Sequence, residues 1–298
     1  MPSLKEVRSR IVSVNSTKQI TAAMKMVSAA KLRRAQDAII RMRPYAEKLQ
    51  TILSNVSATL NGNESKYGVQ REVKNVLLVA IVSNRGLAGA FNTQVFRSIR
   101  RLAAEHEAQG HTVHVLPLGK KAMDNYRRTK YFRTELPTDG ASLYDGLNFD
   151  KVAPMAELIM KLFADGTYDQ VTLVYNRFKN AAVQVLTEEQ YLPVAPPAAP
   201  VSSSAGENNG AKVDYIMEPS REEIVENIIP KSLKIQLYKA LLDSNAAEHG
   251  ARMTAMHKAT DNADALLKSL KLTYNKARQA SITNEILEIV GGAEALKG

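Results

Sequence analysis

Three groups of residues have types and spacings that could do chemistry, and the first is a loop with two glycines. It reads Ser83-Asn84-Arg85-Gly86-Leu87-Ala88-Gly89-Ala90-Phe91-Asn92 and follows an apolar run. A glycine loop between a strand and a helix is where doubly wound folds bind phosphates. However, Gly86 and Gly89 match neither the three-glycine dinucleotide fingerprint nor a phosphate loop that ends in Gly-Lys-Ser/Thr. The spacing favours turn-forming glycines over a nucleotide site.

The second group is the five histidines: His106, His111, His114, His249 and His257. Their spacing to carboxylates matches no metal-ligand pattern, and we expect His249 and His257 to face solvent on a helix. The sequence has no Gly-x-Ser-x-Gly nucleophile elbow and no carboxylate pair isolated among apolar residues. It therefore predicts no catalytic residue, no metal site and no cofactor.

The third group is a dense polar run near the C-terminus. Arg278 and Gln279 offer hydrogen-bond donors, and the planar guanidinium of Arg278 suits a carboxylate. Thr283 and Glu285 follow within two turns of a helix. Two interpretations stay open: a binding surface for a partner protein, and the solvated flank of a coiled coil.

The element that must position this run is a helix over about 230–298. Up to the glycines at 291 and 292 it has about 60 residues, which corresponds to ~90 Å, and a helix this long needs a partner helix or a surrounding sleeve. Pro230 suits the first turn, where a missing N–H costs nothing. Apolar residues at three- and four-residue steps predict a coiled-coil seam: Leu237, Leu241, Ala247, Ala251, Ala263, Leu266, Leu270, Ala277 and Ala280.

A second long helix is expected over about 3–60, and it is the natural partner. Ser3 and Glu6 form a capping box at its start, and Pro44 is expected to kink it. Met24 and Met26 lie among small residues and lysines; the pattern favours core filling, and the alternative is an adaptable contact surface. The seam is predicted at Leu4, Val7, Ile11 and Val14, and again at Leu49, Ile52, Val56 and Leu60.

Between the two helices the periodicity changes to strands that alternate with helices. Apolar runs predict strands over 75–82, 112–118, 170–175 and 182–186, with helices between them. This alternation predicts a mostly parallel, doubly wound (Rossmann-like) α/β domain inserted into an antiparallel coiled coil. We expect domains at 1–60, 70–222 and 230–298, a mobile loop at about 195–211, an edge strand at 214–217 and a short helix capped by Ser220.

Charge and composition limit the class of partner. The net charge is +10, and residues 1–60 carry eleven Lys and Arg against three Asp and Glu, a net +8. Such a basic helix points to an acidic partner, which could be nucleic acid, anionic lipid or an acidic protein; the alternative of a solvated helix face stays open.

The sequence contains no cysteine, no apolar run of spanning length and no signal-peptide pattern. We therefore expect a cytosolic protein without direct membrane insertion.

Five stretches together resemble one known family. They are Leu4–Ile11, Thr17–Thr21, Met24–Lys31, Ala259–Ala263 and Ala277–Glu285, and the loop Ser83–Asn92 also matches. In this order they resemble the γ subunit family of F-type (F1Fo) ATP synthases across nearly the whole chain. Asn84 stands where that family commonly has Asp, and Ala88 where it often has Cys.

The resemblance implies a central-stalk rotor without catalytic residues of its own, at the cytoplasmic face of the bacterial plasma membrane. Its partners would be the α3β3 hexamer, the ε subunit and the c-ring, and nucleic acid is not among them. It implies contacts to the β subunit at Met24, Lys25, Arg278, Gln279, Thr283 and Glu285, and places Arg85, Gly86 and Gly89 in a loop of the foot domain. A basic nucleic-acid-binding protein and a nucleotide-dependent enzyme are the alternatives.

Overall fold

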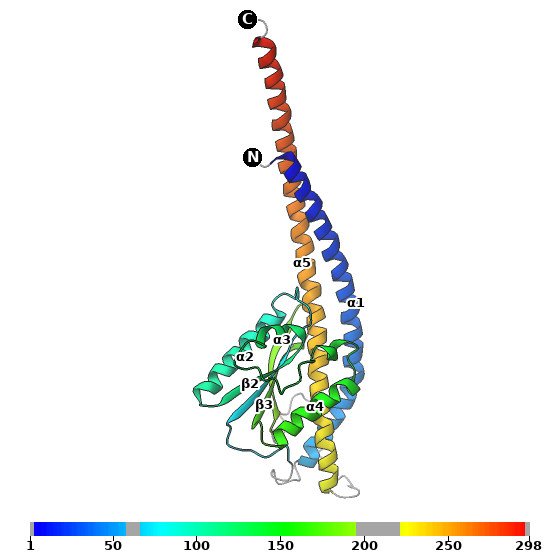
Figure 1. Ribbon diagram of the computed structural model, residues 1–298. Coiled ribbons are helices and arrows are strands. Elements are labelled where there is room, and N and C mark those ends of the chain that lie inside the picture. Colours follow the sequence, from blue (N-terminus) through cyan, green and yellow to red (C-terminus); the bar gives the residue numbers. More distant parts are fainter. Residues whose placement is uncertain (1–2, 58–65, 195–220, 296–298) are drawn as a thin grey trace, which may run out of the picture. The chain divides into compact units, whose positions relative to one another are not determined.

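The computed structural model describes residues 3–57, 66–194 and 221–295 (Figure 1). These residues fall into two compact units. One unit joins the two chain ends, Met1–Ala30 and Arg252–Gly298, and the other is Lys31–Ala251. The predicted mobile loop, the edge strand at 214–217 and the cap at Ser220 lie outside the described residues.

Two long helices begin and end the described chain. Helix α1 spans Leu4–Ser57, and the backbone N–H of Glu6 donates to Ser3 Oγ at 3.3 Å, which confirms the predicted cap. Helix α1 continues through Pro44, so this proline does not end it. Helix α5 spans Arg221–Ala295.

The predicted start of the last helix at Pro230 is wrong. Helix α5 begins at Arg221 and contains Pro230, so the expected short helix and the long helix are one element. Proline in a helix removes one backbone hydrogen bond. The flanking side chains of Ile229 and Leu233 are buried in the core of the α/β unit, and this burial offsets the loss.

The larger unit, Lys31–Ala251, contains a four-stranded sheet. Its strands are β1 (Asn75–Ile81), β2 (Thr112–Leu118), β3 (Gln170–Phe178) and β4 (Gln184–Leu192), in the order β2-β1-β3-β4. Strand β1 pairs in parallel with β2 and β3, whereas β4 pairs with β3 in the antiparallel sense. The prediction of a mostly parallel α/β sheet is confirmed, with one antiparallel edge strand that is longer than the run expected at 182–186.

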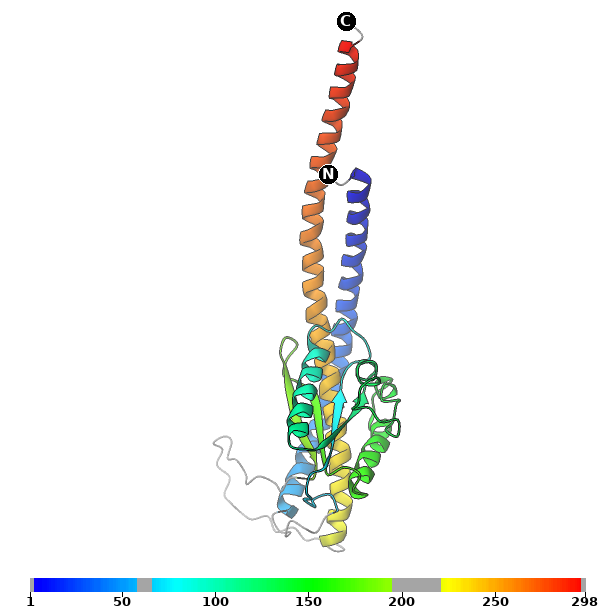
Figure 2. The same ribbon diagram turned by 60° about the vertical axis from the view of Figure 1, so that its left-hand side comes forward.

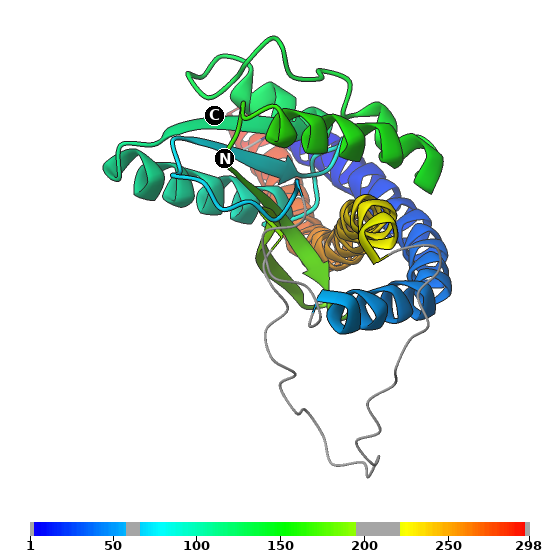
Figure 3. The same cartoon turned by 90° about the horizontal axis from the view of Figure 1, so that it is seen from below.

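Helices cover both faces of this sheet (Figure 3). Helices α2 (Phe91–Ala108) and α3 (Lys120–Tyr126) pack on one face, where Val95, Ile99 and Tyr126 lie against β1 and β2. Helix α4 (Phe149–Ala164) packs on the other face, and the short 3-10 helix η1 (Ser142–Tyr144) precedes it. Central strands covered on both faces must be apolar throughout, which is why β1 appears as an unbroken apolar run.

Helix α5 shares the second face of the sheet with α4. Leu237 and Leu241 are fully buried in the same core as Phe163 and Leu77. Ala247 packs with Ala88 and Phe91 instead. The prediction that these three α5 residues form a coiled-coil seam is therefore wrong, because the apolar side chains in this part of α5 pack into the α/β unit.

The smaller unit, Met1–Ala30 with Arg252–Gly298, is a pair of antiparallel helices that lie side by side (Figures 1 and 2). Lys18 contacts Asp264, Thr21 contacts Thr260, and Lys25 contacts His257, so residue numbers rise along α1 as they fall along α5. This order establishes the antiparallel pairing that the sequence predicts.

The buried seam of this pair differs in part from the predicted one. On α1, Val7, Thr21 and Ser28 are buried at heptad spacing. On α5 the buried residues include Met256, Ala263 and Leu267, whereas the predicted seam residue Leu266 is 49% exposed. The prediction is confirmed for Val7 and Ala263 and is wrong for Leu266, because the adjacent Leu267 is equally apolar and is the one that is buried.

Candidate functional site

The C-terminal part of α5 extends beyond the first residue of α1 (Figures 1 and 2). Arg278, Gln279, Thr283 and Glu285 lie toward the C-terminal end of α5 and are all exposed. The hydroxyl of Thr283 donates to the Gln279 carbonyl at 2.9 Å, and Ser281 donates to Glu285 at 3.3 Å. The guanidinium of Arg278 has no hydrogen bond or ion pair with any residue that the structure describes, so its donors face outward.

The same segment carries apolar side chains that no described residue covers. Ile286 is 54% exposed, Leu287 63% and Ile289 72%. Apolar residues that gather on one uncovered segment are typical of a protein–protein interface. The prediction from the sequence named the polar residues of this segment but not these apolar ones, although their number was a readable signal.

Met24 and Lys25 lie on α1 within the helix pair. Both are partly buried, and Lys25 Nζ lies 3.4 Å from His257 Nδ1 on α5. Met26 is 68% exposed, so the prediction of core filling is wrong for this methionine. With Ile20 at 59% and Val27 at 57%, Met26 gives α1 an exposed apolar surface beside the basic residues.

Polar contacts hold the middle of the helix pair. Lys18 Nζ lies 2.5 Å from Asp264 Oδ1, and this ammonium lowers the pKa of the Asp264 carboxyl. The hydroxyl of Thr260 contacts that of Thr21 at 2.9 Å. Polar groups at seam positions typically fix the register of paired helices at a cost in stability. Here they hold α1 and α5 in one alignment.

The loop from Ser83 to Asn92 in the α/β unit uses its polar groups internally. The Asn84 side chain donates to the Ala141 carbonyl at 2.9 Å and accepts from the Lys120 amide at 2.9 Å. Asn92 donates to Ser83 Oγ at 2.8 Å. The asparagine side chains of this loop are therefore held by bonds within the α/β unit.

The backbone of the same loop is strained and its tip is exposed. Gly89 has a φ of 59° and Leu87 a φ of 64°, a conformation that is rare for a bulky residue. The Leu87 side chain is nevertheless 67% exposed, and Arg85 is exposed as well. Strain at an exposed loop is typical of a contact site. The turn-forming prediction is confirmed for Gly89.

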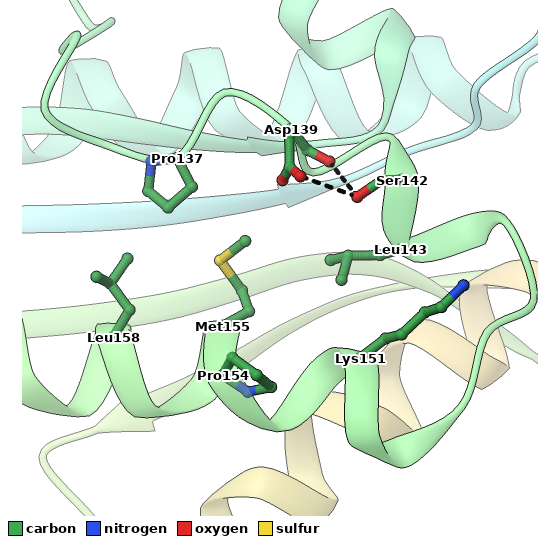
Figure 4. Close-up of a pocket in the computed structure, with 8 residues that line it drawn as sticks. All are labelled: Pro137, Asp139, Ser142, Leu143, Lys151, Pro154, Met155 and Leu158. Carbon is green, nitrogen blue, oxygen red and sulfur yellow. Dashed lines mark hydrogen bonds between the residues drawn. The ribbon is translucent and has the colours of Figure 1, made fainter.

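A pocket of about 430 Å³ opens between helix α4 and the loop that connects α3 to η1 (Figure 4). Pro137, Met155 and Leu158 supply apolar walls, and Ser142 donates to the Asp139 carbonyl oxygen and carboxylate. Lys151 is engaged by the Asp145 carbonyl. No histidine is among the residues that line this pocket.

The described residues contain no group of three or more His, Cys, Asp or Glu side chains arranged to hold a metal ion. None of the described helices is both long and apolar enough to cross a membrane. His257 is exposed as expected, whereas the Nδ1 atom of His249 is buried.

The whole chain matches known proteins. Residues 3–296 match the family model described as ATP synthase. The ATP synthase gamma chain of Flavobacterium johnsoniae is 58% identical over 299 aligned residues, and that of Flavobacterium psychrophilum is 56% identical, each with all of both chains covered. This chain belongs to the ATP synthase gamma chain family. The resemblance found in the terminal motifs is confirmed.

Solved structures of this family have a similar fold. The central stalk of the Tetrahymena thermophila mitochondrial ATP synthase is 27% identical with a TM-score of 0.56, covering 80% of this chain and 99% of that one. The rotor of the Euglena gracilis enzyme is 21% identical with a TM-score of 0.63, covering 94% of this chain and 98% of that one. At that identity the second likeness concerns the fold alone.

Proposed function

We propose that this chain is the central rotor subunit of an F1Fo ATP synthase and couples proton-driven c-ring rotation to ATP synthesis by the β subunits. Family membership over the full length supports this function, and one structural observation carries it. The end of α5 exposes Arg278 together with a set of apolar residues, as a shaft inside a protein sleeve requires.

The proposed partners are the α3β3 hexamer, the ε subunit and the c-ring, at the cytoplasmic face of the bacterial plasma membrane. The helix pair would contact the hexamer, and the α/β domain would contact ε and the c-ring. The division into domains at 1–60, 70–222 and 230–298 stays a prediction. We place Arg85, Gly86 and Gly89 in a contact loop of the α/β domain, because Arg85 and Leu87 are exposed there.

The proposed mechanism is mechanical, and the chain itself supplies no catalytic residue. One asymmetric rod inside three identical β subunits must contact each of them differently, so its orientation shifts the conformational balance of each site. Moving a two-state site from 1:99 to 99:1 requires ~5.5 kcal/mol of differential binding. Several weak contacts can supply this sum without one tight contact that would stop rotation.

Six residues are proposed to make contacts with the β subunits. Met24 and Lys25 would face the lever region, and the exposed Met26 and Val27 follow them on the same turn of α1. Arg278, Gln279, Thr283 and Glu285 would engage β loops through the outward-facing groups of α5. An acidic partner also explains the +8 charge of residues 1–60 without nucleic acid, and the family assignment supports the rotor over the nucleic-acid-binding alternative.

Co-purification tests this function directly. A tagged full-length chain, expressed in its own host, is expected to bring down α, β and ε subunits in a complex with ATPase activity. Reconstituted vesicles that contain the complex should pump protons on addition of ATP. A chain that purifies alone, or a complex that pumps equally well without it, would contradict the proposal.

A further inference from the structure

The C-terminal end of α2 carries two histidines that the rotor function does not use. His106 lies in the last turn of α2, and His111 follows the helix after Gly110. Their Nδ1 atoms are 3.2 Å apart, their ring centroids are 5.5 Å apart, and both side chains are partly buried. Without another ligand, one Nδ1–H donates to the other ring. Two imidazole nitrogens therefore face each other across a single proton.

The backbone builds this pair. The amide of His111 donates to the His106 carbonyl at 3.0 Å, and the amide of Gly110 donates to the Glu107 carbonyl at 3.0 Å. This is a Schellman motif, and Gly110 has the required positive φ of 84°. The motif normally brings two apolar side chains into contact at these positions. Here it brings two imidazoles into contact and holds them with little freedom.

We propose that His106 and His111 bind a divalent transition-metal ion, Zn²⁺ being the test ion, through their two Nδ1 atoms. Imidazole nitrogen suits zinc, copper and nickel. A tetrahedral zinc ion with Zn–N bonds of about 2.0–2.1 Å separates two of its nitrogen ligands by about 3.3 Å. The spacing in the pair is already close to that value. When the two rings tilt, the lone pairs of both Nδ1 atoms point to one position beside the line that joins these nitrogens. The metal ion takes that position in place of the Nδ1 proton between the rings.

Two carboxylates, those of Glu105 and Glu107, flank His106 in the sequence. Glu105 lies 2.7 Å from Arg101 and Glu107 lies 2.6 Å from Lys130, so both carboxylates are engaged in ion pairs. They supply nearby negative charge and leave the remaining coordination positions of the ion to water.

Zn²⁺ titration of the full chain by calorimetry tests this site. The wild type is expected to bind one ion saturably at pH 7.5. His106→Gln and His111→Gln should each weaken binding by at least about 100-fold, because the loss of one arm removes the chelate advantage. Bound Co²⁺ provides a second readout, since its visible absorption reports imidazole ligation and should be lost in both variants.

His257→Gln is the matched control, because His257 is an exposed histidine that contacts Asp261 one turn away on α5 at 3.4 Å. This variant should bind Zn²⁺ like the wild type. Circular dichroism should give the same helix content for all variants. Unsaturable binding by the wild type, unchanged affinity in both α2 variants, or loss of binding in His257→Gln would each overturn the proposal. None of these outcomes bears on the rotor function.

Discussion

Gly119 is the residue at which backbone geometry leaves the least freedom. It joins β2 to α3 with a φ of 114°, and a Cβ built there would lie 2.2 Å from the Val82 carbonyl oxygen. The amide of Val82 donates to the Leu118 carbonyl at 3.0 Å, so a shift of Val82 away from the new Cβ would weaken the contact between the ends of β1 and β2. We expect Gly119→Ala to lower the free energy of unfolding by about 3–5 kcal/mol, the sum of backbone strain and overpacking.

Gly110→Ala is the matched control for Gly119→Ala. Gly110 also has a positive φ, of 84°, but a Cβ there would meet no atom within 4 Å. Gly110→Ala should lower the free energy of unfolding only by the strain of the left-handed backbone conformation, about 1–2 kcal/mol. Urea unfolding followed by circular dichroism measures both variants. Equal costs would show that the contact with Val82 does not decide the need for glycine at Gly119.

His114 makes stability depend on pH. It lies on β2 with 7% of its surface exposed, and its Nε2 accepts from Arg133 Nε at 3.1 Å. Burial, and then the Arg133 charge, lower its pKa from the ordinary value of 6.5. The folded state therefore binds fewer protons than the unfolded state. The contribution of neutral His114 to the free energy of unfolding is therefore fully present above pH 6.5, and it decreases as the pH falls below that value.

We expect the free energy of unfolding to fall between pH 7.5 and pH 5.5, and to fall less in His114→Gln. Glutamine can still accept from Arg133 but does not titrate. His106, whose pKa is also lowered, contributes to the slope in both proteins. Urea midpoints across this range provide the measurement. Identical slopes in the two proteins would mean that His114 does not carry the effect.

At the scale of elements, the buried seam between α1 and α5 includes Leu267 but not its neighbour Leu266. Leu267 is 7% exposed and Leu266 is 49% exposed on the same turn of α5. Leu267→Ala should lower the free energy of unfolding by about 2–3 kcal/mol through lost burial and a residual cavity. Leu266→Ala should cost less than about 1 kcal/mol.

Thermal unfolding of the full-length variants, monitored by helix signal, measures this difference. The two substitutions remove the same atoms from neighbouring positions, so helix propensity changes equally in both. A larger loss of unfolding free energy in Leu266→Ala than in Leu267→Ala would support the seam that was predicted from the sequence. It would also contradict the register given by the contact of Thr21 with Thr260.

The elements themselves were largely readable from the sequence. The apolar run at 75–82 predicted β1, because a parallel strand covered on both faces has no polar side. The cap at Ser3 and the glycine turn at Gly89 were predicted from local chemistry. The start of α5 was not, because Pro230 is a helix-start signal locally and only burial of its neighbours in the core overrides it.

At the scale of the whole molecule, the rotor function predicts that Arg278 affects coupling more than catalysis. Arg278→Glu reverses a charge on an exposed, uncovered segment of α5. Repulsion should replace attraction at carboxylates of a β subunit in some orientations of the rotor. We expect the assembled enzyme to retain ATP hydrolysis but to pump about tenfold less per ATP, which corresponds to about 1.4 kcal/mol of lost coupling.

Lys276→Glu is the matched control, since Lys276 is an exposed cation two residues earlier on another face of the same helix. Proton pumping and ATP turnover in reconstituted vesicles give the coupling ratio for each variant. Equal ratios in Arg278→Glu and the wild type would remove Arg278 from the proposed contact set. A loss in Lys276→Glu as large as in Arg278→Glu would indicate general charge repulsion and no specific contact.

The sequence by itself determined the kinds of elements, their order and the family. Local rules of capping, periodicity and turn chemistry act within a few residues, and the motifs from Leu4 to Ile11 and from Ala277 to Glu285 need no fold to be recognised. It also determined that the two ends carry long helices, because nothing from Arg221 to the end except Pro230 and the glycines interrupts the pattern.

The tertiary structure alone decided which apolar residues face which partner. Leu237 and Leu266 look alike in the sequence, yet one is fully buried in the sheet core and the other is half exposed. The contact of His106 with His111 likewise depends on the turn at Gly110. A periodic pattern specifies a face of a helix, but the surface that covers that face comes from distant parts of the chain, and no local rule contains that information.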